Sequence, residues 1–236
     1  QMNTPEFDHK IAVNEYGFYC VPDEYLKREV PKLLMQGKVY EPDTINLIKR
    51  LAGKGDVIAG GAFVGDFFPA ISQALDNKAQ LHSFEPHPTS FEAASYTVQL
   101  NGLKNVKLHP LAIGSEEGNL PLLVANAKGQ SMSAQTKIVL DDHAGTKVNV
   151  DVKTLDQIVP KSRKISVLQL DIEGHEVPAI LGAKRILNDH APVVILEGPR
   201  PWKQQTFQDA LDEACGAGTY RLTGVMERNA VYLRVS

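Results

Sequence analysis

The chain has 236 residues, of which 43% are hydrophobic and 22% are charged, and its formal net charge is −3. These ordinary values argue against a largely disordered chain and against a strongly basic nucleic-acid-binding protein. Two cysteines, Cys20 and Cys215, are too few for a disulfide framework or a Cys-rich zinc site. No apolar run approaches the roughly 18 residues of a membrane-spanning helix, so we expect a cytoplasmic protein with no membrane partner.

The first 53 residues have the least regular pattern and predict an N-terminal strand and helix extension. Residues 17–21 predict a short strand, and residues 23–34 predict a helical segment that Pro31 interrupts. A clearer helix is expected at residues 42–51, because Pro42 suits the first helical position and a glycine follows the last apolar residue.

Residues 54–236 predict the core, in which short apolar segments alternate with helical patterns. Strands are expected at residues 56–59, 79–84, 106–112, 165–170 and 193–196. Helices are expected at residues 66–75, 89–100, 154–159, 177–187 and 204–214. This alternation indicates an α/β fold with a mostly parallel sheet that is covered on both faces.

Two regions of this core depart from the alternation. Strands at residues 219–226 and 230–235 predict a C-terminal antiparallel hairpin. Residues 118–153 predict a β insertion, with an antiparallel pair around a polar loop at residues 131–133. Because long insertions in compact domains are often functional, that loop is a candidate lid.

The turn after the first core strand indicates a nucleoside cofactor. Its sequence, residues 60–65, is Gly-Gly-Ala-Phe-Val-Gly, and its glycines allow a sharp turn and close approach of the backbone to a ligand. Glu85 ends the next strand, where a carboxylate accepts hydrogen bonds from ribose hydroxyls. The simpler alternative is a strand–helix turn beside an unrelated surface carboxylate.

The identity of the nucleoside cofactor depends on Ala62. The pattern Gly60-x-Ala62-x-x-Gly65 is close to the dinucleotide fingerprint, which makes an NAD(P)-dependent oxidoreductase one alternative. The methyl group of Ala62, however, obstructs the close pyrophosphate approach that a glycine at this position permits. This substitution and the terminal hairpin favour a class I methyltransferase, whose cofactor has no pyrophosphate.

A second group of candidate residues follows the strand at residues 165–170. His175 titrates near neutrality without assistance, so it is a candidate general base for removing a hydroxyl proton. Asp171 and Glu173 are candidates for orienting that base, and Asp171 with Glu197 could bind a divalent cation. Alternatively, the two carboxylates cap the following helix and His175 lies on its exposed first turn.

Four further residues have simpler interpretations. We expect His82 to be packed or hydrogen-bonded within its strand, and His87 to face solvent from its loop. His109 is expected to be packed, with an approach to an adenine as the alternative. Trp202, the only tryptophan, either stacks on a sugar ring at the mouth of the site or anchors its loop.

Taken in order, these motifs resemble the FkbM family of S-adenosylmethionine-dependent methyltransferases. The segments that carry the resemblance are residues 57–65, 83–88, 101–106, 111–114, 154–156, 170–176 and 181–183. The resemblance implies a class I methyltransferase (Rossmann-like) fold. It also implies an enzyme that methylates a hydroxyl of a sugar, a glycan or a related small polyol. It implies S-adenosylmethionine contacts from Gly60, Gly61, Phe63, Gly65, Glu85, Pro86 and Ala112, the last at the end of the third core strand.

The sequence departs from the family pattern at two positions. Ala59 stands where an acidic residue is usual, and Phe63 stands where asparagine is usual. Because the acidic residue often holds the methionine amino group, another group must do so here, or cofactor affinity is reduced. Ala59 therefore motivates a further alternative, a non-catalytic methyltransferase-like binding module. The acceptor, the oligomeric state and any metal requirement stay open at this stage.

Overall fold

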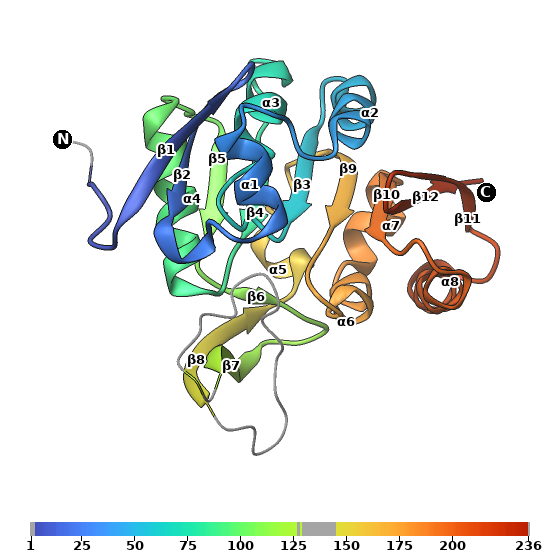
Figure 1. Cartoon of the computed structure of the whole chain (residues 1–236). Coiled ribbons are helices and arrows are strands. Elements are labelled where there is room, and N and C mark those ends of the chain that lie inside the picture. Colours follow the sequence, from blue (N-terminus) through green and yellow to red (C-terminus); the bar gives the residue numbers. More distant parts are fainter. Residues whose placement is uncertain (1–2, 127, 129–144, 236) are drawn as a thin grey trace.

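A seven-stranded sheet forms the centre of the computed structural model, which describes residues 3–126, 128 and 145–235 (Figure 1). In spatial order its strands are β11 (Tyr220–Met226), β12 (Asn229–Arg234), β10 (Val193–Glu197), β9 (Ile165–Leu170), β3 (Asp56–Gly60), β4 (Leu81–Phe84) and β5 (Val106–His109). The strands β10, β9, β3, β4 and β5 are parallel, whereas β12 is antiparallel to β10 and β11 is antiparallel to β12. The predicted parallel sheet with a C-terminal antiparallel hairpin is confirmed.

The strand order reverses beside β3. The chain passes from β3 through β4 to β5 on one side, and later returns to place β9 on the other side of β3. Gly60 and Leu170 pair where these two strands end. In an open α/β sheet, ligands bind at such a reversal, outside the carboxyl ends of the strands.

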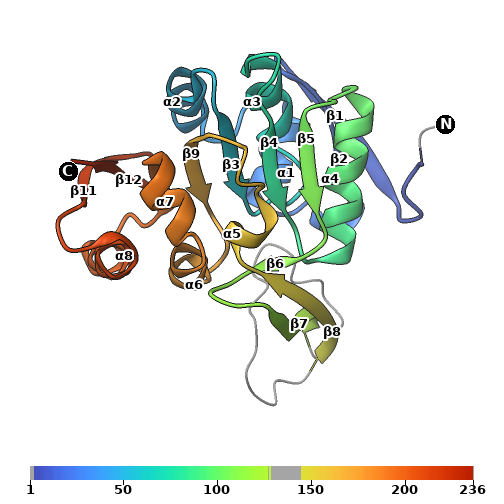
Figure 2. The same cartoon turned by 180° about the vertical axis from the view of Figure 1, so that it is seen from behind.

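Helices cover both faces of the sheet (Figures 1 and 2). One face packs against α2 (Pro42–Ala52), α3 (Phe68–Ala74) and α4 (Pro88–Leu100). The other packs against α5 (Leu155–Ile158), α6 (Glu176–Leu181), α7 (Lys184–His190) and α8 (Pro201–Cys215). All five residues of β3 are buried, which explains why its sequence lacks the polar alternation of a half-exposed strand.

The helix expected at residues 177–187 is divided in two, because α6 ends before Gly182 and α7 begins after Ala183. A Cβ atom on Gly182 would overlap the carbonyl oxygen of Gly114, so the chain approaches that loop too closely for a side chain. The carboxylate of Asp156 then accepts the backbone N–H groups of Arg185 at 2.8 Å and Ile186 at 3.1 Å. These two hydrogen bonds cap the N-terminus of α7.

The N-terminal extension contains a hairpin, β1 (His9–Asn14) and β2 (Gly17–Pro22), followed by the 3₁₀ turn η1 (Asp23–Tyr25) and α1 (Glu29–Met35). Pro31 does not interrupt α1 as expected, because it is the third helical residue and its missing N–H would have no intrahelical acceptor there. The break lies earlier, between η1 and α1. The hairpin packs against α4, where the Cys20 N–H donates to the Thr97 hydroxyl at 3.0 Å.

The insertion forms a separate sheet of β6 (Ala112–Ile113), β8 (Gly145–Lys153) and β7 (Gly118–Asn126), and the expected β7–β8 antiparallel pair is confirmed. It lies on the side toward which the arrowheads of β3 and β9 point (Figure 1). The third core strand is shorter than expected and ends at His109, since Pro110 cannot donate to a ladder. Ala112 therefore belongs to β6. The candidate lid at residues 131–133 lies outside the described residues.

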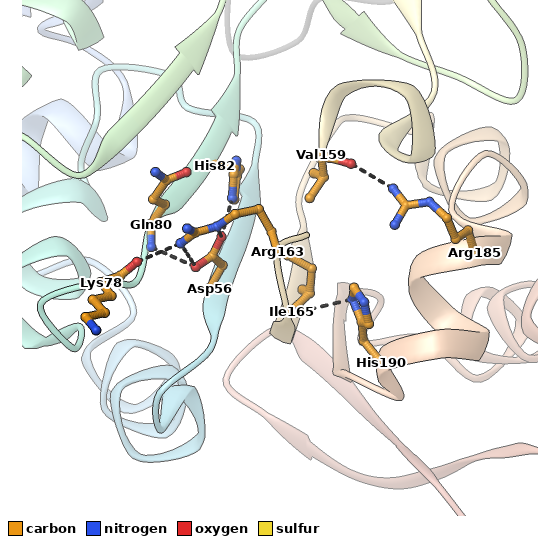
Figure 3. Close-up of polar contacts among 9 residues, drawn as sticks. All are labelled: Asp56, Lys78, Gln80, His82, Val159, Arg163, Ile165, Arg185 and His190. Carbon is orange, nitrogen blue, oxygen red and sulfur yellow. Dashed lines mark hydrogen bonds and ion pairs between the residues drawn. The ribbon is translucent and has the colours of Figure 1, made fainter. Parts of the chain in front are cut away.

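The opposite end of β3 carries a buried polar cluster (Figure 3). The Asp56 carboxylate accepts hydrogen bonds from Arg163 at 2.6 and 2.7 Å, from the Gln80 N–H at 2.9 Å and from His82 at 2.8 Å. The expectation of a hydrogen-bonded His82 is confirmed. Because Asp56 is the first residue of β3, this cluster lies at the end of the strand remote from Gly60 and joins strands to the loop before β9.

Candidate functional site

A cavity of about 720 Å³ lies at the carboxyl ends of the parallel strands, within the roughly 300–1,000 Å³ typical of small-molecule sites. Most of the predicted site residues line it: Gly61, Phe63, Glu85, Pro86, Ala112, Asp171, Glu173 and His175. Gly60 and Gly65 are not among the lining residues. The cavity therefore brings both predicted groups of residues, the nucleoside group and the catalytic group, into one site.

The Gly-rich turn has an unusual backbone. Gly61 and Gly65 have φ angles of 84° and 78°, and Phe63 adopts a left-handed φ of 50° despite its side chain. A Cβ atom on Gly61 would overlap the carbonyl oxygen of Asp171. The turn after β3 therefore packs directly against the end of β9, and only glycine fits at this contact.

Glu85 is held in a fixed orientation at the end of β4. Its two carboxylate oxygens accept the backbone N–H groups of Phe63 and His87, each at 2.9 Å, and the residue is only 7% exposed. Burial raises the pKa of Glu85 to about 7, although the two N–H groups act to lower it. The carboxylate retains lone pairs for further donors, as recognition of ribose hydroxyls requires.

The N-terminal extension supplies one wall of the cavity, which the sequence did not reveal. The Phe63 ring stacks on Tyr25 with 5.3 Å between centroids and an interplanar angle of 20°. The Arg28 guanidinium lies 4.3 Å from the Tyr25 ring centroid, and both Arg28 and Tyr40 line the cavity. Tyr40 belongs to the loop between α1 and α2; residues 40–42 resemble the family's entry segment, but the resemblance gives Tyr40 no role in the cavity.

Three acidic residues, Asp171, Glu173 and Glu197, line the cavity at the ends of β9 and β10. Burial raises the pKa of Asp171 well above its usual range, and Glu197, Glu173 and Glu41 raise it further, in that order. The site thus favours the protonated form of Asp171, which can donate a hydrogen bond. The Glu197 carboxylate forms an ion pair with the Arg228 guanidinium at 2.9 Å. Arg228 comes from the turn of the C-terminal hairpin and was also missed in the sequence.

His175 is oriented by the backbone of the insertion. Its Nδ1 atom lies 3.0 Å from the carbonyl oxygen of Ile113, which can only accept. This contact therefore places a proton on Nδ1, and the neutral ring keeps its lone pair on Nε2. The side chain lies immediately before α6 and is partly buried rather than exposed on a helical turn. The orienting partner is Ile113, in place of the expected Asp171 or Glu173.

The expectation for His87 was wrong. It is 3% exposed, because the loop after β4 lies against the insertion, and its Nε2 is 3.4 Å from the carbonyl oxygen of Val124. Burial lowers its pKa to about 4. His109 stacks on Phe84 with 5.5 Å between centroids, which supports the packing interpretation. Trp202 is 63% exposed and is not among the cavity-lining residues.

Within residues 3–126, 128 and 145–235, no three His, Cys, Asp or Glu side chains are grouped so that they could hold a metal ion. In the same residues, every helix is too short or too polar to cross a bilayer.

Comparison with known proteins identifies the family. The model of the Methyltransferase FkbM domain matches residues 56–222. The chain belongs to the FkbM methyltransferase family. Methyltransferase 1 of Beauveria bassiana (strain ARSEF 2860) is 27% identical to this FkbM-family chain over 143 residues, which are 53% of this chain and 57% of that protein.

Solved structures show the same fold for this FkbM-family chain. The FkbM methyltransferase of Methylobacillus flagellatus KT has a TM-score of 0.54 and 16% identity, over 76% of this chain and 43% of that one. A methyltransferase of Geobacter sulfurreducens has a TM-score of 0.52 and 15% identity, over 84% of this chain and 82% of that one. The expected class I methyltransferase fold is confirmed. The chain spans about half the length of the Beauveria and Methylobacillus proteins.

Proposed function

We propose that this chain is an S-adenosylmethionine-dependent O-methyltransferase that acts on a hydroxyl of a sugar, a glycan or a related small polyol. The observation that carries the proposal is that one cavity contains both Glu85 and His175. A buried carboxylate at the end of the second parallel strand suits a nucleoside ribose, and an imidazole with a free Nε2 suits removal of a hydroxyl proton. Membership of the FkbM family supports methyl transfer.

The residues of the cavity fit S-adenosylmethionine better than a dinucleotide. The Ala62 N–H donates to the Phe84 carbonyl at 3.0 Å, the Gly65 N–H donates to the Ala62 carbonyl at 2.7 Å, and the Phe63 N–H donates to Glu85. These N–H groups of the turn are thus already bonded within the chain. A pyrophosphate needs free N–H groups at this position, whereas a nucleoside with a ribose needs only the carboxylate.

The chain's contribution to methyl transfer is alignment and proton removal. The cofactor, when bound, supplies an activated methyl group on a sulfonium centre. His175 accepts the proton of the acceptor hydroxyl at Nε2, while its Nδ1–H stays bonded to Ile113. Asp171 and Glu173 lie in the same loop and line the cavity with His175, where their carboxyl oxygens can hydrogen-bond to the other hydroxyl groups of the acceptor. Correct placement of two reactants is itself a large contribution to the rate.

A neutral polyol is the acceptor class that the polar end of the cavity suits. Asp171, Glu173, Glu197 and Tyr40 offer oxygen atoms that donate and accept hydrogen bonds, as the hydroxyl groups of a sugar require. Arg228, which lines the cavity together with these residues, is paired with Glu197. We therefore do not expect phosphorylated or nucleic-acid acceptors.

The proposal is tested by incubating the chain with methyl-labelled S-adenosylmethionine and a panel of methyl glycosides, alditols and matched primary amines. The proposed function predicts label on an oxygen of at least one glycoside or alditol. Label confined to amines would overturn the O-methyltransferase assignment. Absence of transfer to every compound, with S-adenosylhomocysteine bound tightly, would favour the non-catalytic binding module.

A further inference from the structure

The cofactor's ammonium group needs a partner that the end of β3 does not offer. Ala59 lines the cavity where β3 ends, but its side chain is a methyl group. An ammonium group that leaves water for a partly closed cavity loses its hydration, and it is stabilised there only by an acceptor or a negative charge. Another side chain of the cavity must therefore supply that acceptor if the cofactor binds.

The acidic residues that line the cavity are Glu29, Asp66, Glu85, Asp171, Glu173 and Glu197. Most of these already have a partner of their own. Glu29 and Glu197 both form ion pairs with Arg228, and Glu85 accepts two backbone N–H groups. Asp171 is hydrogen-bonded to Glu197. Glu173 is exposed and lies in the loop after β9 with the proposed base His175, and not beside the turn after β3. Asp66 is the acid that remains.

Asp66 lies next to the Gly-rich turn, between Gly65 and the start of α3. It is partly buried and lines the same cavity as Ala59 and Gly61. None of the ion pairs found among the described residues includes Asp66. Burial raises its pKa to about 7, although a hydrogen bond from its own backbone N–H acts to lower it, and the charge of Glu41 raises it further. The side chain is therefore a carboxyl group that a cationic ligand would stabilise in its ionised form.

We propose that Asp66 binds the α-ammonium group of the cofactor and so replaces the acid that is missing at Ala59. This inference rests on the proposed function, because it assumes that S-adenosylmethionine is the cofactor. Of the cofactor's two cationic centres, the sulfonium must face the acceptor, whereas the ammonium has three N–H donors that suit a carboxylate. Asp66 directly follows Gly65 of the turn after β3, whereas the proposed base His175 follows β9.

Binding of an ammonium group should release a proton from Asp66 near neutral pH. A raised pKa means that the free protein holds part of its Asp66 protonated near pH 7, and a bound cation lowers that pKa. Glu85 also titrates near pH 7, and Glu41 and Tyr40 are further titratable groups close to this part of the cavity. The contribution of Asp66 must therefore be separated from that of Glu85.

Two ligands achieve this separation. S-adenosylhomocysteine carries the ribose and the ammonium, whereas 5′-methylthioadenosine carries the ribose without the amino-acid part. Calorimetry of the wild-type chain near pH 7, in buffers of different ionisation enthalpy, measures the protons released with each ligand. We expect more protons released with S-adenosylhomocysteine than with 5′-methylthioadenosine. Equal proton release would overturn the proposal, and this comparison needs no variant.

The variant Asp66→Asn provides the second test. It should weaken S-adenosylhomocysteine binding about 10- to 100-fold, as expected for loss of a charge-assisted hydrogen bond, and leave 5′-methylthioadenosine binding within about twofold. Restoring a carboxylate at the strand end with Ala59→Asp in the Asp66→Asn background should recover part of the loss. Unchanged S-adenosylhomocysteine affinity, or equal loss with both ligands, would overturn the role of Asp66. If the wild-type chain binds neither ligand, the proposed function fails instead.

Discussion

The carboxylate of Glu85 accepts the backbone N–H of Phe63 at 2.9 Å. This bond joins the end of β4 to the Gly-rich turn after β3, across the edge of the sheet where the cavity opens. The second oxygen of Glu85 accepts the His87 N–H at the same distance. Glu85 thus fixes the shape of the turn and faces the cavity, so its replacement should affect both the turn and the ligand.

Glu85→Gln should weaken S-adenosylhomocysteine binding about 10- to 100-fold, because an NH₂ group replaces one of two accepting oxygens and the charge is lost. Calorimetry of the purified variant measures this change. Glu116→Gln is a matched control, since Glu116 is exposed and is not a cavity-lining residue. Equal affinity of wild type and Glu85→Gln would remove Glu85 from the cofactor site.

The affinity for 5′-methylthioadenosine should depend on pH through Glu85. The free residue has a pKa raised to about 7 by burial, and ribose hydroxyls need the ionised carboxylate as acceptor. Binding should therefore be strongest above pH 7 and weaken as the pH falls, by at most about tenfold per pH unit for one linked proton. A titration series from pH 8 to about pH 5 in Asp66→Asn measures this dependence without the contribution of Asp66. A flat profile would contradict the assignment.

His175→Ala should lower the turnover number by about 10²- to 10⁴-fold and leave S-adenosylhomocysteine affinity unchanged, because the base acts on the acceptor. His175→Asn separates chemistry from position, since its amide can still donate to the Ile113 carbonyl but cannot take up a proton. Both variants should lose turnover to a similar extent. Near-normal turnover in either variant would show that another group removes the proton.

Gly61→Ala should destabilise the chain by more than about 2 kcal/mol and abolish cofactor binding, because the new Cβ overlaps the Asp171 carbonyl and φ is positive. Gly118→Ala is the control, since nothing lies within 4 Å of its added Cβ. Chemical denaturation and calorimetry measure the two effects. A Gly61→Ala protein as stable as Gly118→Ala would show that the turn after β3 is not in close contact with the Asp171 carbonyl.

Asp56 should make the stability of the fold dependent on acid pH. Burial acts to raise its pKa, but hydrogen bonds from His82, Arg163 and Gln80 outweigh burial and lower it to about 2 (Figure 3). The unfolded value is about 3.9, so the bonds contribute about 2–3 kcal/mol above that pH, and this is lost as the pH falls toward 2.

Asp56→Asn tests this linkage by urea denaturation at pH 7 and at about pH 3. The variant should be less stable than wild type by about 2–3 kcal/mol at pH 7, and the difference should shrink at the lower pH. Asp189→Asn, at an exposed position of α7, is the control. A difference that is the same at both pH values would contradict the role given to the Asp56 carboxylate.

The sheet and the part of the cavity formed by the Gly-rich turn and Glu85 could be predicted because their signals are local. Buried strands such as β10 are short apolar runs, and the Gly-rich turn and Glu85 lie within or directly after such strands. The strand β1 gave no signal because only Ala12 of its six residues is buried. Its conformation depends on pairing with β2 and not on an apolar face of its own.

The remaining half of the site depends on contacts between distant parts of the chain. Tyr40 and Arg228 come from the N-terminal extension and the C-terminal hairpin, yet they line the same cavity. Tyr40 lies in residues 40–42, which resemble the family's entry segment, but that resemblance does not place it in the cavity. Arg228 lies in no motif, and its contact with Glu197 follows only from the order of the strands. His87 lies between two prolines, a pattern that predicts an exposed loop, but contact with the insertion buries the His87 side chain.

The most direct test of the account is a calorimetric comparison of S-adenosylhomocysteine with NADH on the wild-type chain, repeated on Glu85→Gln. Both ligands contain an adenosine, but only NADH requires free N–H groups for a pyrophosphate. The account predicts that S-adenosylhomocysteine binds, that NADH does not, and that Glu85→Gln weakens the first ligand at least about tenfold. Binding of NADH without binding of S-adenosylhomocysteine would contradict it.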